Sequence, residues 1–159
     1  HTIQWTINAS GMFKGQLKVK VEGMLAIAIS VILIFVCYTD IRFRQITNVT
    51  TLLIFLLSLL LAFHHVDDLS LIILSLLFCV GFVFSVAGVI GAGDIKLVCA
   101  LSTGLSTPHI GDFLLLTGMA GIPLTLLTCL YYRVFSKQNV ITVPYGVAIC
   151  CGYWLLWAV

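Results

Sequence analysis

Two aspartates stand out in a chain that otherwise carries few charges. Asp94 lies between two glycines and a lysine in the stretch GVIGAGDIKLVCA, residues 88–100. Asp40 follows a long apolar run and begins the polar stretch DIRFRQITN. A carboxylate at the edge of hydrocarbon is unfavourable unless it is paired, hydrated or functional. We therefore take Asp40 and Asp94 as candidate catalytic residues.

Two neighbouring carboxyl groups can hydrolyse an amide. Because like charges repel, one carboxyl holds a proton while the other stays ionised. The ionised group can then take a proton from water, and the protonated group can donate to the scissile carbonyl. Gly91 and Gly93 precede Asp94 in the sequence and could support the site. Glycine permits unusual backbone angles and the close approach of another chain.

The composition indicates what kind of protein positions these residues. Of the 159 residues, 61% are hydrophobic and 9% are charged, and the mean hydropathy is +1.18. Soluble domains carry about 25% charged residues. The apolar runs are continuous, whereas a membrane β-barrel alternates apolar and polar residues. The sequence therefore predicts an all-α, polytopic membrane protein whose surroundings are membrane lipid.

Six apolar segments are predicted, at residues 24–39, 49–63, 69–93, 95–106, 113–134 and 140–159. A full span needs about 20 residues, so the third, fifth and sixth are long enough. The first, second and fourth are short, although the first could extend back to Val19. We expect residues 1–23 to be a tag, linker or leader-like segment outside a single transmembrane domain of residues 24–159. The chain outside residues 1–23 is neutral, which excludes a nucleic-acid partner.

The distribution of charge predicts how the segments are oriented. Basic residues fall in every second connection, and the positive-inside rule places these connections in the cytoplasm. Asp40 ends the first segment and Asp94 begins the fourth, both on this side. The topology thus brings together two carboxylates that are far apart in the sequence.

Three stretches resemble a known family. GAGDIKL, residues 91–97, resembles the GxGD motif of membrane aspartic proteases in its bacterial prepilin peptidase form. DIRFRQITN resembles the other catalytic segment of those enzymes, and VPYGVAI, residues 143–149, resembles a third. The chain thus resembles bacterial type IV prepilin peptidases over residues 24–159.

This resemblance implies a fold and an activity. It implies a fold of six transmembrane helices, like that of GxGD aspartic proteases, with Asp40 and Asp94 as the catalytic pair. The enzyme would remove the basic leader from type IV pilin-like precursors at the cytoplasmic face of the bacterial inner membrane. The small size resembles the short form that serves tight-adherence (Flp) pili. The particular pilin, the oligomeric state and the aspartate that holds the proton stay open.

The resemblance also concerns further activities and cofactors. Longer relatives carry a cytoplasmic insertion with paired cysteines and methylate the new N-terminus, but here only nine residues link the first two segments. We therefore expect no methyltransferase activity, no zinc and no other cofactor.

Both aspartates also have structural interpretations. Asp94 could be the N-cap of the fourth segment, which would also stabilise its charge. Asp40 could pair with Arg44 at a solvated helix end. Arg42 and Arg44 are first of all topology determinants, and they could also attract an acidic residue of the substrate.

Four further residues are candidates for substrate binding or support of the site. Lys96 is two positions from Asp94 and so points away from it on a helix; it could anchor the interface or contact substrate. Asn48 could cap the second segment. Pro144 suits the first turn of the sixth segment, and Tyr145 follows it.

Other polar clusters and the cysteines have simpler explanations. HHVDD, residues 64–68, resembles a metal-binding cluster but is expected to be a hydrated turn on the outer side, as are His109 and Asp112. The cysteines lie mostly in apolar runs without a CxxC pair and are expected to be small buried hydrophobic residues.

Two other functions remain open. Buried carboxylates in a small helical bundle can relay protons in a transporter, although such proteins usually carry midplane charges and internal repeats. A structural membrane subunit is the third possibility. Cleavage of a pilin precursor, lost on neutralising either Asp40 or Asp94, would separate the peptidase from both.

Overall fold

The computed structural model describes residues 2–43, 46–62, 68–88, 90–135 and 144–158, and this part of the chain is helical without a strand. Its helices are α1 (Thr2–Phe43), α2 (Asn48–Ala62), α3 (Asp68–Val86), α4 (Ala92–Ser102), α5 (Thr107–Phe135) and α6 (Tyr145–Ala158). Each of the six predicted apolar segments corresponds to one helix. The prediction of an all-α protein is confirmed.

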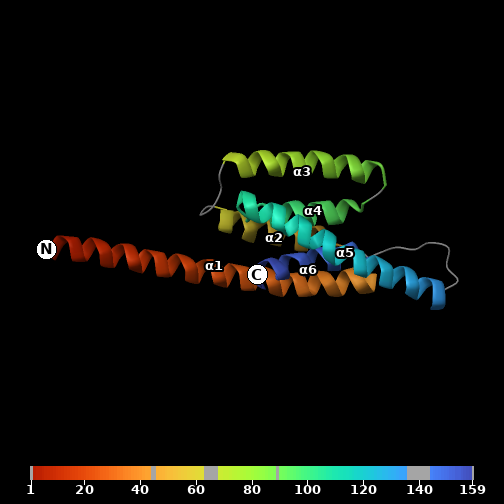
Figure 1. Cartoon of the computed structure of the whole chain (residues 1–159), viewed down its shortest axis with the longest axis horizontal. Coiled ribbons are helices and arrows are strands. Elements are labelled where there is room, and N and C mark those ends of the chain that lie inside the picture. Colours follow the sequence, from red (N-terminus) through yellow and green to blue (C-terminus); the bar gives the residue numbers. More distant parts are fainter. Residues whose placement is uncertain (1, 44–45, 63–67, 89, 136–143, 159) are drawn as a thin grey trace.

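The chain runs back and forth, so successive helices point in opposite directions (Figure 1). The end of α1 and the beginnings of α2, α4 and α6 therefore lie at the same end of the bundle. Helix α6 packs against α1, α4 and α5, while α4 also packs against α2 and α3. Helices α1, α4 and α6 are the ones that carry the three motifs of the sequence, and they meet at this end.

A small core lies between the helices. Leu33 of α1, Leu97 of α4 and Phe113 of α5 are completely buried. The Phe113 ring meets that of Tyr153, from α6, edge to face at a centroid distance of 6.3 Å. Such aromatic pairs stabilise packing beyond the area that they bury.

The outer surfaces of the helices are apolar. Large hydrophobic side chains are exposed along α1, α2, α3 and α5, among them Ile34, Leu52, Phe82 and Leu126. Two helical stretches are long and apolar enough to cross a membrane, Val19–Phe43 with mean hydropathy 2.4 and Thr107–Leu130 with 2.0. Shorter apolar helices are Asn48–Ala62, Ser70–Val86 and Tyr145–Ala158. Extensive exposed apolar surface of this kind marks a protein that is covered by lipid or by partners.

Several predicted lengths were wrong. The third segment ends at Val86 rather than at residue 93, because Gly88 adopts the left-handed conformation with φ 71° and turns the chain. The first segment does extend back to Val19, the extension that the sequence allowed, and it lies within one continuous helix from Thr2. The described part of α6 has 14 residues, fewer than the predicted full span.

The polar stretch after the fourth segment was predicted to be a connection before residue 113 but forms the first turns of α5. The Ser106 carbonyl accepts a bond from the Ile110 N–H at 3.1 Å. The Ser106 hydroxyl lies 2.6 Å from Nδ1 of His109. Pro108 is tolerated because a first turn does not need its N–H.

Candidate active site

Asp40 lies in the last turn of α1 and is buried, with 6% of its surface exposed. Its carboxyl group is held against the backbone of Gly146, in the first turn of α6. A Cβ atom added at Gly146 would lie 2.7 Å from Oδ2 of Asp40 and 2.9 Å from Cγ. Only a glycine therefore leaves room for this carboxyl.

Asp94 is the third residue of α4 and is partly buried. The N-cap of the helix is Gly91, so the interpretation of Asp94 as the N-cap was wrong. The carboxylate instead reaches back and accepts a hydrogen bond from the Gly91 backbone N–H. Acidic side chains at the third helical position commonly do this. A Cβ atom at Gly91 would approach Oδ2 of Asp94 to 2.8 Å, so this glycine too makes room for a carboxylate.

Ile46 lies between α4 and α6, next to Gly93 of α4 and Gly146 of α6. A Cβ atom at Gly93 would lie 3.3 Å from Cβ of Ile46, and one at Gly146 would lie 3.3 Å from its Cδ1. Ile46 thus lies against the beginnings of both α4 and α6.

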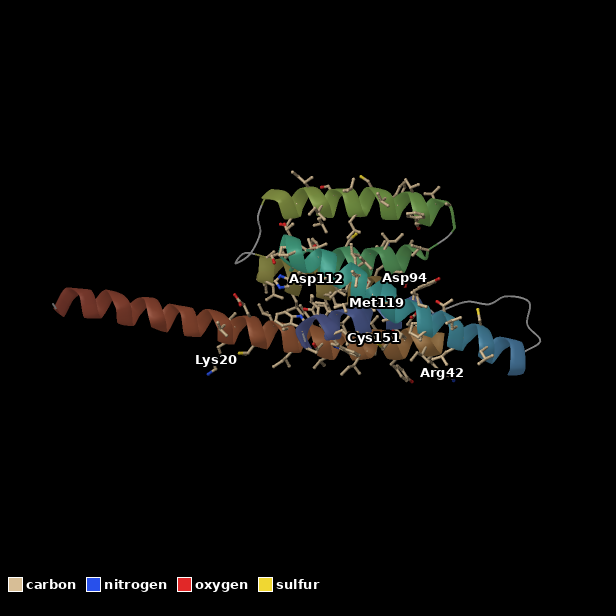
Figure 2. All side chains as sticks on the ribbon, viewed as in Figure 1. Lys20, Arg42, Asp94, Asp112, Met119 and Cys151 are labelled. Carbon is tan, nitrogen blue, oxygen red and sulfur yellow. The ribbon has the colours of Figure 1, made fainter. Side chains whose placement is uncertain are left out.

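The two carboxyl groups interact electrostatically. The pKa of Asp94 is raised from 3.8 to about 6, first by desolvation and then by the charge of Asp40, while the hydrogen bond from Gly91 opposes the rise. Asp94 precedes the apolar part of α4 and lies outside the two long apolar stretches. The raised pKa lets Asp94 hold a proton closer to neutral pH than an ordinary aspartate does. Figure 2 shows Asp94 at the end of α4 that faces this site.

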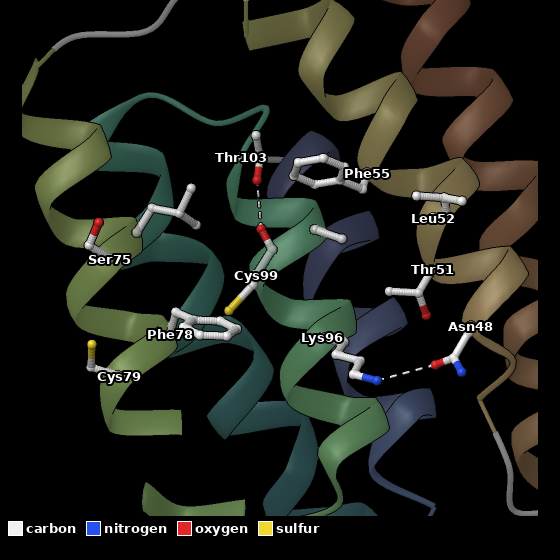
Figure 3. A pocket seen from close by; sticks show the side chains of 12 residues that line it. Asn48, Thr51, Leu52, Phe55, Ser75, Phe78, Cys79, Lys96, Cys99 and Thr103 are labelled. Atoms are coloured by element: carbon white, nitrogen blue, oxygen red, sulfur yellow. Dashed lines mark hydrogen bonds between the residues drawn. The ribbon is translucent and has the colours of Figure 1, made fainter. Parts of the chain in front are cut away.

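The Lys96 side chain reaches from α4 toward α2. Its Nζ donates to Oδ1 of Asn48 at 3.3 Å, across the space between α4 and α2 (Figure 3). Asn48 does not cap α2, so that prediction was wrong. Thr47 stands at the N-cap position, because its carbonyl accepts the first helical bond, from the Thr51 N–H at 3.2 Å, and also a bond from the Thr50 hydroxyl at 2.8 Å.

The other predicted supporting residues that the structure describes lie at the beginning of α6 and at the end of α1. The Pro144 carbonyl accepts a bond from the Val147 N–H at 3.2 Å, and the exposed Tyr145 begins the helix. Arg42 is exposed and projects away from the helices (Figure 2). Arg44, and with it the suggested pairing with Asp40, lies outside the described residues.

Gly146 is the residue of this site that sequence reasoning missed. It stands directly after Tyr145 in the motif VPYGVAI. A glycine inside a motif at a predicted helix start was the available indication, because a helix otherwise disfavours glycine.

The predictions about metals and cysteines are tested only in part. Within the described residues, no three His, Cys, Asp or Glu side chains form a group that could hold a metal ion. Residues 64–67 of HHVDD lie outside the described residues. Cys150 is buried and its thiol donates to the Leu33 carbonyl at 3.6 Å, as expected of a small core residue, whereas Cys79 is exposed.

Comparison with protein families gives a match that covers much of the chain. The family model described as the type IV leader peptidase family matches residues 27–129, which is more than half of the chain. No curated protein and no solved structure matches significantly. The matched range contains both Asp40 and Asp94.

Proposed function

The chain belongs to the type IV leader peptidase family, and from this premise we propose that it is an aspartic endopeptidase that removes the basic leader from type IV prepilins. Family membership makes it a leader peptidase-type protease. The observation that carries the finer assignment is the electrostatic coupling of Asp40 and Asp94 at one end of the bundle.

The roles of the two carboxyl groups follow from their environments. Asp40, ionised, accepts a proton from a water molecule whose oxygen attacks the scissile carbonyl carbon. Asp94, protonated, donates to the carbonyl oxygen as the tetrahedral intermediate forms. Collapse of the intermediate breaks the C–N bond. The departing amine takes the proton that Asp40 received, and the hydroxyl formed from the carbonyl oxygen returns its proton to Asp94, which restores both carboxyl groups. The charge of Asp40 favours the protonated form of Asp94, which supports this division of roles.

We place the reaction at the cytoplasmic face of the bacterial inner membrane, with the apolar parts of the six helices in or across the bilayer and the two aspartates at its cytoplasmic edge. Two long apolar helices and the exposed apolar surface support membrane association. Arg42 and Lys96 lie at the end of the bundle that carries the aspartates, and basic residues favour the cytoplasmic side.

The test is cleavage of a purified precursor by the protein in lipid nanodiscs. Asp40→Asn and Asp94→Asn should each reduce kcat/KM at least about 100-fold, the usual effect of removing a general acid or base. Asp112→Asn is the matched control, since Asp112 is exposed on α5. Thermal unfolding would establish that each variant is folded.

The same variants separate the peptidase from a proton relay. Folded Asp40→Asn or Asp94→Asn protein that cleaves at the wild-type rate would overturn the proposal. Proton flux into liposomes that disappears in these variants, with cleavage intact, would favour the relay.

A further inference from the structure

A groove lies on the side of α4 that faces away from the two aspartates. Helices α2 and α3 both pack against α4, with little contact between them in the described part of the chain. The space between them is a cavity of about 620 Å³ (Figure 3). This volume is within the usual range for ligand pockets. Leu52 and Phe55 of α2 form one wall, and Leu74 and Phe78 of α3 form the other.

The floor of the groove is one face of α4. Lys96, Cys99, Ala100 and Thr103 are spaced by three, four and seven positions, so they lie along a single stripe of the helix. Three of them have small side chains, which permit a second helix to approach closely in an apolar environment. The shape and the lining thus suit an apolar helix, as in the helix-in-groove mode of recognition.

The charge in the groove is concentrated at the end near the aspartates. Lys96 lies two residues after Asp94, and its hydrogen bond there is to the neutral amide of Asn48. No acidic residue is among the described residues that line the cavity. The groove is therefore positive at one end and apolar along the rest.

We infer that this groove binds the apolar helical segment that follows the leader of the precursor. The inference rests on the proposed function. A precursor whose basic leader stays on the cytoplasmic side continues into an apolar span. The charge of Lys96 repels the basic leader. The groove therefore binds the apolar segment, which lies on the other side of the scissile bond. The substrate then crosses the beginning of α4, where Gly91 and Ala92 are exposed, to reach Asp94.

Steric blocking of the groove tests the inference. Leu52→Trp fills the space between α2 and α3, while Leu53→Trp is the matched control on the same helix. Leu52 and Leu53 are 57% and 47% exposed, and only Leu52 is among the residues that line the groove. The two substrates are the full precursor and a short peptide that spans the scissile bond but lacks the apolar segment. The preference for the precursor is its kcat/KM divided by that of the short peptide. Leu52→Trp should reduce this ratio about tenfold, which corresponds to ~1.4 kcal/mol.

Leu53→Trp should retain the wild-type preference. A Leu52→Trp enzyme that retains it as well would overturn the inference while leaving the peptidase assignment intact. A wild-type protein that cleaves neither substrate would contradict the proposed function. The inference that the groove binds the apolar segment would then be tested by a second measurement that needs no cleavage.

That measurement is disulfide crosslinking with the Asp94→Asn protein. Cys79 lines the groove from α3, whereas Cys129 of α5 does not. A precursor with one cysteine in its apolar segment should form an adduct, under a mild thiol oxidant, that disappears when Cys79 and Cys99, which both line the groove, are replaced by serine. An adduct at Cys129 instead, or one that survives the double replacement, would contradict the inference.

Lipid is the competing occupant of such a groove. The crosslinking is therefore repeated in nanodiscs of phosphatidylcholine and of phosphatidylglycerol, whose anionic headgroup would be attracted to Lys96. The adduct should form in both lipids. Its loss in phosphatidylglycerol alone would identify the groove as a lipid site and overturn the inference.

Discussion

Helix α6 carries two glycines that make close contacts of different kinds. Gly146 faces the carboxyl group of Asp40, and Gly152, six residues later, faces Thr117 of α5. A Cβ atom at Gly152 would lie 2.8 Å from both the backbone N and the Cα of Thr117. Besides the Thr117 hydroxyl oxygen, the atoms that it would meet belong to the backbone of a helix, whereas those at Gly146 all belong to the side chains of Asp40 and Ile46.

This difference separates a position that supports chemistry from one that supports packing. A rotating carboxyl relieves the clash at Gly146 and leaves the fold intact, but it moves the group that the proposed reaction uses. A helix backbone at Gly152 has no such freedom, so α5 and α6 must move apart. The comparison thus assigns loss of activity to one glycine and loss of stability to the other.

The largest effect is expected for Gly146→Ala. The added methyl group displaces the Asp40 carboxyl, and a misplacement of about 1 Å can reduce a rate about 100-fold. We therefore expect kcat for precursor cleavage to fall by about this factor, with thermal unfolding close to that of the wild type. An alanine variant that unfolds readily while its folded fraction stays active would reverse the roles assigned to the two glycines.

Gly152→Ala should destabilise the protein instead. Overpacking of a well-packed contact costs about 1–3 kcal/mol. Unfolding in denaturant, followed by intrinsic fluorescence in micelles, should show a lower midpoint. The kcat per folded molecule should stay within about twofold of the wild type, since Thr117 and Gly152 do not contact either aspartate. If Gly152→Ala instead lowers kcat as much as Gly146→Ala does and leaves the stability unchanged, the comparison is wrong.

The coupling between the aspartates predicts a dependence on pH. In the proposed reaction Asp94 acts in its protonated form, and its pKa is raised to about 6, so kcat/KM should decline as the pH rises through this value. In Asp40→Asn the charge that raises the pKa of Asp94 is absent, so this pKa should fall.

Titration followed by carbon NMR of labelled aspartate, with Asp94→Asn to assign the signal, measures this shift without any need for activity. A pKa of Asp94 that is the same with and without the Asp40 charge would mean that the two carboxyl groups do not interact. Desolvation is the larger cause of the raised pKa, so only part of the shift should disappear.

Sequence reasoning could find the elements and the aspartates, but it could not find their contacts. Continuous apolar runs predict helices, and the alternation of charged connections brings Asp40 and Asp94 to one end. The contact between Asp40 and Gly146 joins residues 106 positions apart, and its existence depends on how α1 and α6 pack. Local sequence carries no information about that distance.

Sequence reasoning also could not identify which residues stand at the N-cap positions of α2 and α4. Asp94 and Asn48 are both favoured as caps, yet Gly91 and Thr47 take those positions. The side chains of Asp94 and Asn48 instead bond to a backbone N–H and to Lys96. Capping propensities describe a helix in isolation, and tertiary partners decide between neighbouring candidates. The groove between α2 and α3 was likewise not predictable, because it exists only where two helices pack on a third.

The smallest effect is expected for Ile46→Val, and this change tests why Gly146→Ala is harmful. A Cβ atom at Gly146 meets two neighbours, the carboxyl of Asp40 and the Cδ1 of Ile46, and valine lacks that Cδ1 atom. Ile46→Val alone should cost about 0.5–1.5 kcal/mol of stability and little activity. In the double variant with Gly146→Ala, crowding against Ile46 is relieved but crowding against Asp40 is not. The double variant should therefore stay as inactive as Gly146→Ala, with an interaction energy in kcat near zero. Recovery of cleavage in the double variant would mean that Ile46, and not the carboxyl of Asp40, is what requires glycine at this position.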